Sequence, residues 1–455
     1  MAQARKPRGL RRRKALLKSI REFLTPRVWK QVRNAVPRRR MPRWDVRPLL
    51  WILVTMTWCC GDSLPERFEA ARGVYVLCHD KRRRPGETFQ GFQQALNKLP
   101  LPVLRALAHA LRQRIAQRLD DRWQIKGLIP LGCDGSRMEC PRTAELERHL
   151  GQGGKQDSAP TVWTTAIVHL LTGVAWTWRF GKGGKASERD HLVQMLPSLP
   201  PGALIVADAG YYGYELLLEL LRAGVWFLIR MSSNVKLYTE EGVELTEFRE
   251  GTVYYWPEAV QKKGGPPIQA RLLCIRDKKR KVDVWLLTNL MSPEQLSWAD
   301  ASRFYRWRWE NEGYFRTYKR TLAKVKLSSR TIREVHREAE ASMIATQLLL
   351  AQGALAMPRP RTLSAGEADE PRVMCSPRKV LREIRRDMSN LPGPRGRGGL
   401  AQRLKNCQRE RRPRSSPKVA RPWPRRKDHQ PPQPPKILTL TAAQKSLLSR
   451  CRNAA

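Results

Sequence analysis

The spacing of hydrophobic residues along the chain predicts a helical domain at its start. Through residues 1–125, apolar side chains recur at intervals of three and four, which is the period of amphipathic helices. The longest apolar run, 49–60, extends over about a dozen residues, which is shorter than the roughly 20 that a helix needs to span a bilayer. That run therefore predicts a helix buried inside the domain.

The pattern changes at Leu128, where short apolar strands begin to alternate with helices. This alternation is typical of an α/β core, whose first part we place at residues 126–230. Segments 161–170 and 174–180 predict the two arms of a hairpin, and 204–207 predicts a short buried strand.

The core is expected to be interrupted and then completed. Residues 231–284 contain strand-like segments separated by Gly, Pro and Lys turns, which predicts a β-rich insertion. Its final strand, 282–288, is expected to return to the main sheet, and residues 285–357 to complete the core. Within that last part, Glu338 and Glu340 lie among the core positions of a long apolar helix.

The end of the chain differs from the rest in composition. From 358 to 455, Pro, Arg, Ser and Gly dominate, and this basic sequence predicts a mostly disordered tail that binds nucleic acid. Short helices are expected at 376–387 and near 441–448, whereas most of 388–440 is expected to be disordered.

The charge of the whole chain makes nucleic acid the leading partner. The 86 Lys and Arg residues against 41 Asp and Glu residues give a formal net charge of +45. Such an excess repels itself unless a polyanion offsets it, and residues 1–125 are basic as well as helical, so we expect that domain to bind DNA. A nucleic-acid packing protein is the simplest alternative, but 15 Trp and 41% hydrophobic residues indicate folded domains.

The cysteines indicate a reducing compartment and no structural zinc. Cys59 and Cys60 are adjacent, Cys133 and Cys140 are separated by six residues, and the others of the nine are scattered. Zinc sites need closely spaced pairs, and disulfide frameworks usually have an even count, so we expect reduced thiols in a cytosolic chain.

Two aspartates stand where a sheet-edge site would need them. Asp134 follows the apolar strand 128–133 and is itself followed by Gly135, which predicts a turn; Asp208 follows the strand 204–207 in the sequence Asp-Ala-Gly-Tyr. A strand fixes the backbone beneath such a side chain, and a nearby glycine lets a phosphate approach. Turn formation alone is the alternative, because Asp-Gly is common in turns.

A third carboxylate lies on the helical stretch 302–319. Tyr305, Arg308, Glu312 and Lys319 are separated by steps of three, four and seven, which return to one face of an α-helix. A carboxylate flanked by two cations and a phenol is typical of a metal ligand set among phosphate contacts.

Together these carboxylates suit phosphoryl transfer. Asp134, Asp208 and Glu312 could bind two divalent ions, and carboxylate ligands select Mg²⁺ or Mn²⁺. A tyrosine nucleophile is the rival chemistry; its candidates are Tyr211, Tyr212, Tyr214 and Tyr305. His169 and His191 are expected to be satisfied core residues rather than catalytic groups.

The order of these motifs resembles the DDE transposases of bacterial insertion sequences, in particular the family with the Y-x2-R-x3-E-x6-K signature. The resemblance covers roughly residues 125–350, and the signature matches without a gap at 305–319. It implies an RNase H-like mixed sheet with flanking helices, interrupted by a β-rich insertion. It also implies cut-and-paste transposition, in which DNA is hydrolysed at transposon ends and the freed 3′-hydroxyl is joined to target DNA.

The resemblance also implies a role for each matched residue. Asp134, Asp208 and Glu312 would be the catalytic metal ligands, holding two Mg²⁺ or Mn²⁺ ions. Tyr305, Arg308 and Lys319 would contact phosphates at the transposon end. Trp285 lies where family members stack a flipped base, although a buried strand tryptophan is the alternative for that position.

We therefore predict an endonuclease and DNA strand transferase that acts on double-stranded transposon ends and target DNA. The resemblance suggests a homodimer on paired ends, working on the nucleoid in the bacterial cytoplasm, with no membrane association. Two alternatives remain: a decayed or host-adopted derivative that binds DNA without cutting it, and a basic packing protein.

Overall fold

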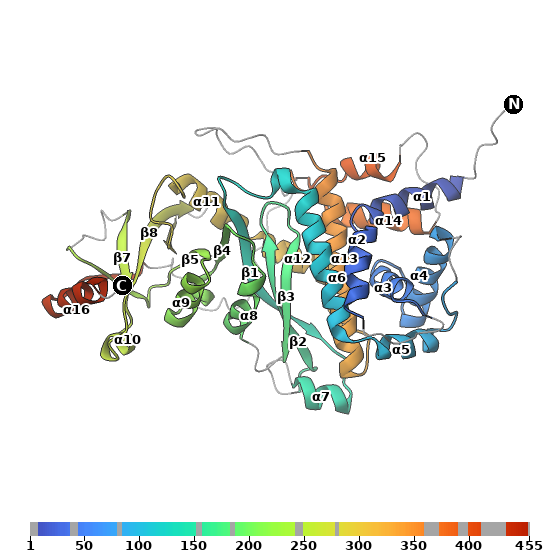
Figure 1. The fold of residues 1–455 in the computed structure, drawn as a ribbon, viewed down its shortest axis with the longest axis horizontal. Helices are drawn as coiled ribbons and strands as arrows, with labels where there is room; N and C mark the ends of the chain where they lie inside the picture. The colour runs from blue at the N-terminus through green and yellow to red at the C-terminus, as the bar shows by residue number, and fades with distance from the viewer. Residues whose placement is uncertain are drawn as a thin grey trace, which may run out of the picture. The chain divides into compact units, whose positions relative to one another are not determined.

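The structure, a computed structural model, describes the chain except for segments at both ends and in several loops. The described residues are 8–36, 44–79, 84–151, 157–182, 187–241, 249–277, 282–358, 373–389, 399–410 and 434–453. The chain forms two compact units whose sequences interleave (Figure 1). Unit 1 comprises residues 1–124, 135–186 and 310–410, and unit 2 comprises residues 125–134, 187–309 and 411–455.

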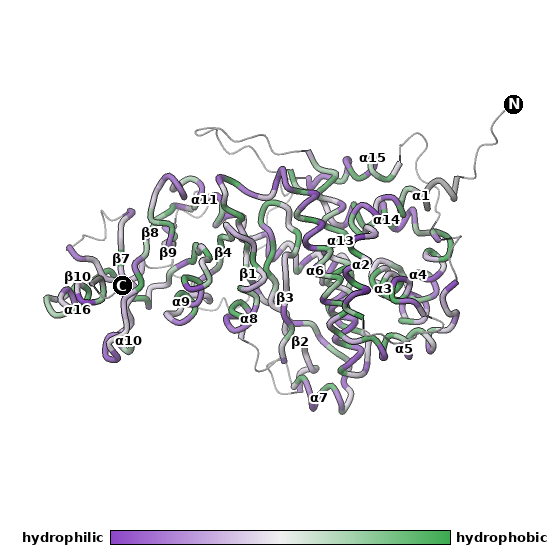
Figure 2. Tube along the Cα trace, viewed as in Figure 1, coloured by the Kyte–Doolittle hydropathy of each residue, from purple (hydrophilic) through white to green (hydrophobic). Residues whose placement is uncertain are grey.

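Unit 1 is mainly helical, and its first part confirms the predicted N-terminal helices. Its α-helices within the described residues are α1 (Arg8–Arg21), α2 (Pro26–Asn34), α3 (Val46–Met56), α4 (Leu64–Cys78), α5 (Phe89–Lys98), α6 (Leu101–Arg118), α7 (Ala144–Leu150), α12 (Glu310–Arg316), α13 (Ile332–Ala356), α14 (Pro377–Met388) and α15 (Leu400–Lys405). Figure 2 shows hydrophobic and hydrophilic residues alternating along α5 and α6, as in amphipathic helices.

Helix α13 forms the centre of unit 1. It has 25 residues, begins where Thr331 caps the backbone N–H of Glu334, and is buried along most of its length. It packs against α3, α6 and α14 (Figure 1). Helix α3 is itself buried at all but one of its residues, which confirms the prediction made from the apolar run 49–60. No helix among the described residues is long and apolar enough to cross a membrane.

The strands of unit 1 include the predicted hairpin. Strand β2 (Thr161–His169) pairs antiparallel with β3 (Ala175–Lys182). His169 at the end of β2 is fully buried, its ring stacks on Trp123, and its two nitrogens lie 2.8 Å from Thr172 Oγ1 and 2.8 Å from the Trp123 carbonyl oxygen. It is thus a satisfied core residue, as the sequence indicated.

The turn predicted at Gly135 is wrong. Strand β1 runs without interruption from Ile129 to Glu139 and passes from unit 2 into unit 1 between Asp134 and Gly135. In unit 1 its end is held by residues far away in sequence. The Glu139 N–H donates to the Val325 carbonyl, and the Leu327 N–H donates to the Glu139 carbonyl. Long-range backbone hydrogen bonds therefore outweigh the local turn preference of Asp-Gly.

Unit 2 is built on a mixed sheet. The strands, in spatial order, are β10 (Lys436–Thr439), β6 (Lys236–Thr239), β7 (Glu250–Tyr255), β8 (Ile268–Asp277), β9 (Val282–Thr288), β5 (Trp226–Arg230), β4 (Ala203–Ala207) and the first half of β1. Its helices are α8 (Glu188–Met195), α9 (Tyr214–Arg222), α10 (Glu258–Lys262), α11 (Trp298–Trp307) and α16 (Ala442–Asn453). The mixed α/β fold predicted from the sequence is confirmed.

The β-rich insertion extends this sheet. Strands β6, β7 and β8 are antiparallel neighbours, and β9 pairs antiparallel with both β8 and β5. The strand predicted at 282–288 therefore does return to the main sheet. Strands β1, β4 and β5 are parallel to one another, so the sheet changes from parallel to antiparallel at β5.

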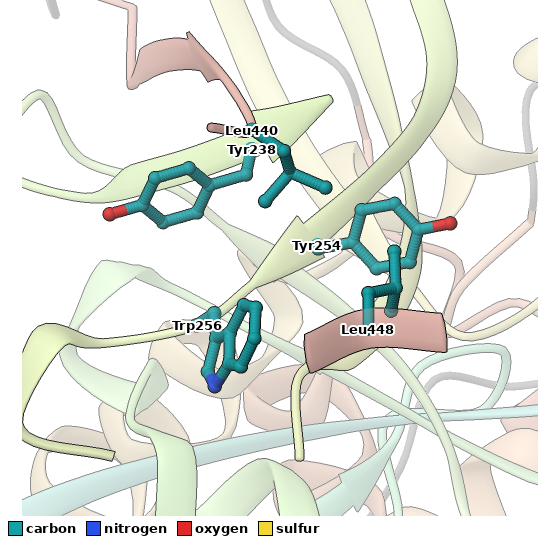
Figure 3. Packing of buried hydrophobic residues seen from close by; sticks show 5 residues of the cluster. All are labelled: Tyr238, Tyr254, Trp256, Leu440 and Leu448. Carbon is teal, nitrogen blue, oxygen red and sulfur yellow. The ribbon is translucent and has the colours of Figure 1, made fainter. Parts of the chain in front are cut away.

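The C-terminal region contributes ordered elements to both units. The predicted helices at 376–387 and 441–448 are found as α14 and α16, but α15 and β10 were not predicted. Strand β10 pairs in parallel with β6, and Leu440 and Leu448 pack on Tyr238, Tyr254 and Trp256 of the insertion (Figure 3). The predicted disorder of 388–440 falls largely on 390–398 and 411–433, which lie outside the described residues.

Candidate functional site

The two predicted aspartates occupy equivalent positions on neighbouring strands of unit 2. Strands β1 and β4 are parallel, and Gly132 pairs with Val206. Asp134 and Asp208 each lie two residues further along, so the same register places them at one level, where the strand pairing ends. Both side chains are half-buried. Strand β4 ends just before Asp208, whereas β1 continues past Asp134 to Glu139, so both carboxylates lie at the level where the β1–β4 pairing stops. Two carboxylates at one level of adjacent parallel strands are placed to bind a shared ligand.

The turn after β4 is tied down by hydrogen bonds. Asp208 Oδ1 accepts from the Gly210 N–H at 2.8 Å, which starts a short 3₁₀ turn at Ala209–Tyr211. Helix α8 holds the same turn from outside, because Arg189 Nε donates to the Gly210 carbonyl at 2.8 Å. The backbone that carries Asp208 is therefore fixed independently of any ligand.

Beneath this turn lies a buried hydrogen-bonded chain. The Tyr211 hydroxyl donates to Glu188 Oε2 at 2.8 Å, and Cys133 Sγ lies 3.5 Å from that hydroxyl. Burial raises the pKa of the Cys133 thiol and that of the Tyr211 phenol, so both stay protonated. The pKa of Glu188 is also raised, mainly by burial and to a smaller extent by the charge of Asp208. The hydrogen bond from Tyr211 opposes this shift. This chain positions the loop rather than supplying a nucleophile.

The rival tyrosine chemistry finds little support in these positions. Tyr211 is 2% exposed and is committed to Glu188. The Tyr214 hydroxyl donates to the Pro266 carbonyl at 2.6 Å, and burial raises its pKa. Arg189 lies over the ring of Tyr212, 5.8 Å from its centroid. A nucleophilic tyrosine needs an exposed, activated hydroxyl, and the Tyr211 and Tyr214 hydroxyls are instead engaged in hydrogen bonds.

The positioning roles of Glu188 and Arg189 could not be predicted from the sequence. The local pattern around them indicates only the start of a helix. Their contacts to Gly210 and Tyr211 join residues more than 20 positions apart. No local pattern signals such a contact, because it joins segments that are distant in sequence.

The signature stretch is not one continuous helix, and this corrects the prediction that its four residues share a face. Helix α11 ends at Trp307, where the Arg308 N–H lies 3.2 Å from the carbonyls of both Phe304 and Tyr305, a sharing typical of helix ends. Helix α12 then begins at Glu310. The stretch therefore passes from unit 2 to unit 1 between Trp309 and Glu310.

A second irregularity lies before Lys319. Residues Thr317–Thr321 form a π-helix, closed by the hydrogen bond from the Leu322 N–H to the Thr317 carbonyl at 3.0 Å. Thr317 Oγ1 donates to the Gly313 carbonyl at 2.9 Å and competes with the ordinary helical bond there. A π turn holds more residues than an α turn, so the spacing of seven from Glu312 to Lys319 no longer returns to one face.

Tyr305 and Arg308 lie together in unit 2. The Arg308 guanidinium is 5.6 Å from the centroid of the Tyr305 ring and 5.2 Å from that of Trp309. Tyr305 is 9% exposed, and within the described residues Arg308 Nε is buried with no hydrogen-bond partner. Two aromatic rings thus hold a guanidinium that still has a donor to offer, which suits a phosphate oxygen.

Glu312 and Lys319 lie in unit 1. Glu312 is exposed on α12, whose first residue, Glu310, accepts from Arg409 Nη1 at 2.9 Å. Burial lowers the pKa of Lys319, and the nearby Glu139 carboxylate opposes that shift.

The predicted residues consequently fall into an aspartate pair and a Tyr305–Arg308 pair in unit 2, and a Glu312–Lys319 segment in unit 1. Among the described residues, no group of three or more His, Cys, Asp or Glu side chains is close enough to hold a metal ion. The donor chemistry still fits Mg²⁺ or Mn²⁺ in part. Asp134 and Asp208 supply hard oxygen ligands at one level of the sheet.

Trp285 does not occupy a position suited to stacking on a base. It lies on β9 opposite Cys274 of β8 and is 5% exposed. The Met231 N–H donates to its carbonyl at 2.8 Å. The ring is packed inside unit 2, so the structure does not support a contact with a base. Trp285 is a buried strand tryptophan, which was the alternative for this position.

Comparison with known proteins gives one family match. Residues 133–348 match the family model described as the transposase DDE domain. No curated protein matches the chain. Among solved structures, the cryo-EM structure of a piggyBac transposase synaptic complex with hairpin DNA is 11% identical, with a TM-score of 0.40 over 88% of this chain and 87% of that chain. That structural similarity is too low to carry a conclusion.

Proposed function

We propose that this chain, whose residues 133–348 carry a transposase DDE domain, cuts double-stranded DNA at transposon ends and joins the freed ends to target DNA. The observation that carries the proposal is the matched position of Asp134 and Asp208 on adjacent parallel strands. The domain family in general cleaves and joins DNA with divalent metal ions, and this pair supplies carboxylates for them.

Three residues are proposed as metal ligands. Asp134 and Asp208 would hold the ions at the sheet edge of unit 2, and Glu312 of unit 1 is proposed as the third ligand. When bound, two Mg²⁺ or Mn²⁺ ions would activate a water or a DNA 3′-hydroxyl and stabilise the leaving oxygen. The contribution of the chain itself is to hold these carboxylates still, which the Gly210, Arg189 and Glu188 contacts do around Asp208.

The phosphates beside the cleavage point are proposed to contact Arg308, Tyr305 and Lys319. Arg308 is the strongest of these, because its Nε lacks a partner among the described residues while two aromatic rings fix its plane. Trp285 is left out of this set, because its ring is buried.

Duplex DNA is the proposed substrate and target. A net charge of +45 gives the chain a strong attraction for any polyanion, and the matched domain family cleaves and joins DNA. We further propose that two copies act on paired transposon ends, as transposition by cutting and joining requires both ends of the element.

Strand cleavage tests this function directly. Purified protein is mixed with labelled DNA from the borders of its own gene, with Mg²⁺ or Mn²⁺, beside Asp134→Ala and Glu312→Gln. We expect metal-dependent nicks at a defined border that both variants lack, although both still bind the DNA.

Two other outcomes would point elsewhere. Binding that falls steeply with salt, shows no preference for the border and is never followed by cleavage would indicate a packing protein or a decayed derivative. Cleavage by both variants at the rate of the parent would remove the three carboxylates from the mechanism.

A further inference from the structure

A group of cationic side chains outside the proposed active site gathers in unit 1. It comes from helix α6, strand β3 and the first turns of helix α13, and we refer to it as the α6–α13 cluster. Its members are Arg105, Arg112, Arg179, Arg333, His336 and Arg337.

Direct contacts join the three elements at this cluster. Arg337 Nη2 donates to the Leu99 carbonyl just before α6 at 2.6 Å. The ring of His336 on α13 lies 6.5 Å from that of Phe180 on β3, and Arg112 lies 5.0 Å from the ring centroid of Trp176 on the same strand. The cations are therefore fixed by the core of unit 1 rather than scattered over a loop.

The cluster adjoins a pocket of about 490 Å³. The turn between α5 and α6 and the beginning of α13 line it, with Lys98, Arg333, His336 and Arg337 as its basic residues. Arg337 is 5% exposed, and its Nε has no hydrogen-bond partner among the described residues. Its Nη1 and Nη2 donate to the Arg333 and Leu99 carbonyls, so Nε is the donor left for an anion in the pocket.

The charges of the cluster act on one another. Burial lowers the pKa of Arg112 to about 10, with the Arg179 charge as a second cause. Burial and then Arg105 lower the pKa of Arg179; burial, Arg105 and Arg337 lower that of His336. Two carboxylates oppose these effects, Glu340 beside Arg105 and Arg179, and Glu334 beside Arg337.

An ordinary solvated basic face does not explain this arrangement. On such a face, long cationic side chains extend into water and keep apart. Here Arg112 is 8% exposed and Arg337 is 5% exposed, although desolvation and like charge both disfavour those positions. A bound polyanion would offset both costs.

We propose that the α6–α13 cluster is a DNA-binding surface of unit 1, separate from the carboxylate site, that contacts consecutive backbone phosphates. Lys98 and Arg333 are exposed at the pocket, and Arg179 is half-buried beside Arg112, so these three cations are the ones that reach phosphates. The choice of DNA as the polyanion rests on the proposed function; the anion site itself rests on the contacts above.

Binding to a short random-sequence duplex tests the proposal by fluorescence anisotropy from about 50 to 200 mM salt. The test variant is Lys98→Gln/Arg179→Gln/Arg333→Gln, which spares the buried arginines and the Arg105–Glu340 pair. The matched control, Arg378→Gln/Arg382→Gln/Lys405→Gln, removes the same charge from exposed positions on α14 and α15 of unit 1.

We expect the test variant to bind more weakly at every salt concentration. The slope of log affinity against log salt should fall by about one for each phosphate that the variant no longer touches, so by about three, and affinity in 0.1 M salt should fall by about eightfold for each of them. The control should keep nearly the parental slope. Equal reductions in the two variants would overturn the proposal, because they would reflect net charge alone.

The outcomes also separate this proposal from the proposed function. If the parent cuts border DNA and the test variant binds like the control, the surface is wrong and the transposase function stands. If the parent binds no duplex, the proposed function itself fails.

A second measurement on the unaltered protein covers the case of a test variant that does not fold. Lysine acetylation followed by mass spectrometry should show Lys98 protected when duplex is added and Lys405 unprotected. Equal reactivity of Lys98 with and without DNA would overturn the proposal.

Discussion

Two groups of carboxylates show how differently the units use the same functional group. Glu338 and Glu340 on α13 of unit 1 are 7% and 2% exposed, and each is satisfied by partners in the protein. Asp134 and Asp208 in unit 2 are half-buried on neighbouring parallel strands, at the level where the pairing of those strands stops. The first pair stabilises the fold, whereas the second is held in place at an edge.

The partners of the buried pair make this difference concrete. Glu338 accepts from Lys324 Nζ at 2.7 Å and from the backbone N–H groups of Ser328 and Ser329 at 2.9 and 2.8 Å. Glu340 accepts from Trp178 Nε1 at 2.7 Å and from Arg105 Nε at 3.2 Å. A buried carboxylate with full hydrogen bonding is structural, so burial separates these residues from candidates for chemistry.

The largest expected effect is on activity, from Asp208→Asn. The Asn side chain can still accept from the Gly210 N–H, so the turn should persist while the charge is removed. Because a metal contributes several kcal/mol of transition-state stabilisation, cleavage should fall by about 1000-fold or more, with little change in unfolding free energy. Cleavage rates and urea unfolding measure the two effects, with Glu215→Gln, an exposed residue of unit 2, as the control.

The opposite outcome is expected for Glu338→Gln, which should lose stability. The side chain of Lys324 is 4% exposed and would be left as a buried charge without its carboxylate. Removing one partner of a buried pair costs about 3–5 kcal/mol, which urea unfolding measures through its midpoint. The double variant Lys324→Met/Glu338→Gln should recover part of this stability; a single variant as stable as the parent would contradict the structural role.

Glu340→Gln should have a smaller effect on stability, about 1 kcal/mol. Its cationic partner, Arg105, has a side chain that is 52% exposed, so water can replace the missing carboxylate. The Gln carbonyl can still accept from Trp178. If Glu340→Gln were as destabilising as Glu338→Gln, the exposure of the cationic partner would not determine how much unfolding free energy is lost.

The smallest expected effect is a difference in pH dependence between these two glutamates. Burial favours the neutral form of Glu338, but Lys324 and the Ser329 N–H outweigh it and lower the pKa. The stabilisation from Glu338 is therefore present above the ordinary pKa of a glutamate, and it is lost as pH falls through the lowered pKa of the folded protein. Burial raises the pKa of Glu340, so its contribution is present below the ordinary pKa and is lost as pH rises through the raised one.

Unfolding midpoints from about pH 3 to pH 7 measure this difference. Relative to the parent, Glu338→Gln should lose stability mainly at the upper end of that range. In Glu340→Gln, the contribution of the raised pKa is absent, so its unfolding midpoint should decline less than that of the parent as pH rises. Identical pH profiles for the two variants would contradict these opposite shifts.

Much of the fold and part of the site could be predicted from local pattern. Alternation of apolar residues identified the β2–β3 hairpin and the return of β9, and helical periodicity identified α3 and α13. The position of Asp208 at the end of β4 followed from the same pattern, whereas Asp134 lies within β1 rather than at its end. These features depend on near neighbours in sequence, which is what periodicity records.

Other features depended on interactions that no local pattern contains. The break after Trp307 and the π-helix at Thr317–Thr321 divided a stretch whose spacing predicted one helical face. The clamp of Glu188 and Arg189 on the Asp208 turn joins distant segments, as does the addition of β10 to β6.

The sequence by itself determined most of the helices and strands, the three candidate carboxylates and the attraction to a polyanion, because propensity, spacing and charge are properties of the chain. Only the tertiary structure decided that β1 continues past Asp134, that Asp134 and Asp208 stand at one level, and that Glu338 is paired with Lys324. Strand register and buried ion pairs are set by residues far apart in sequence, whose meeting depends on how the whole core packs.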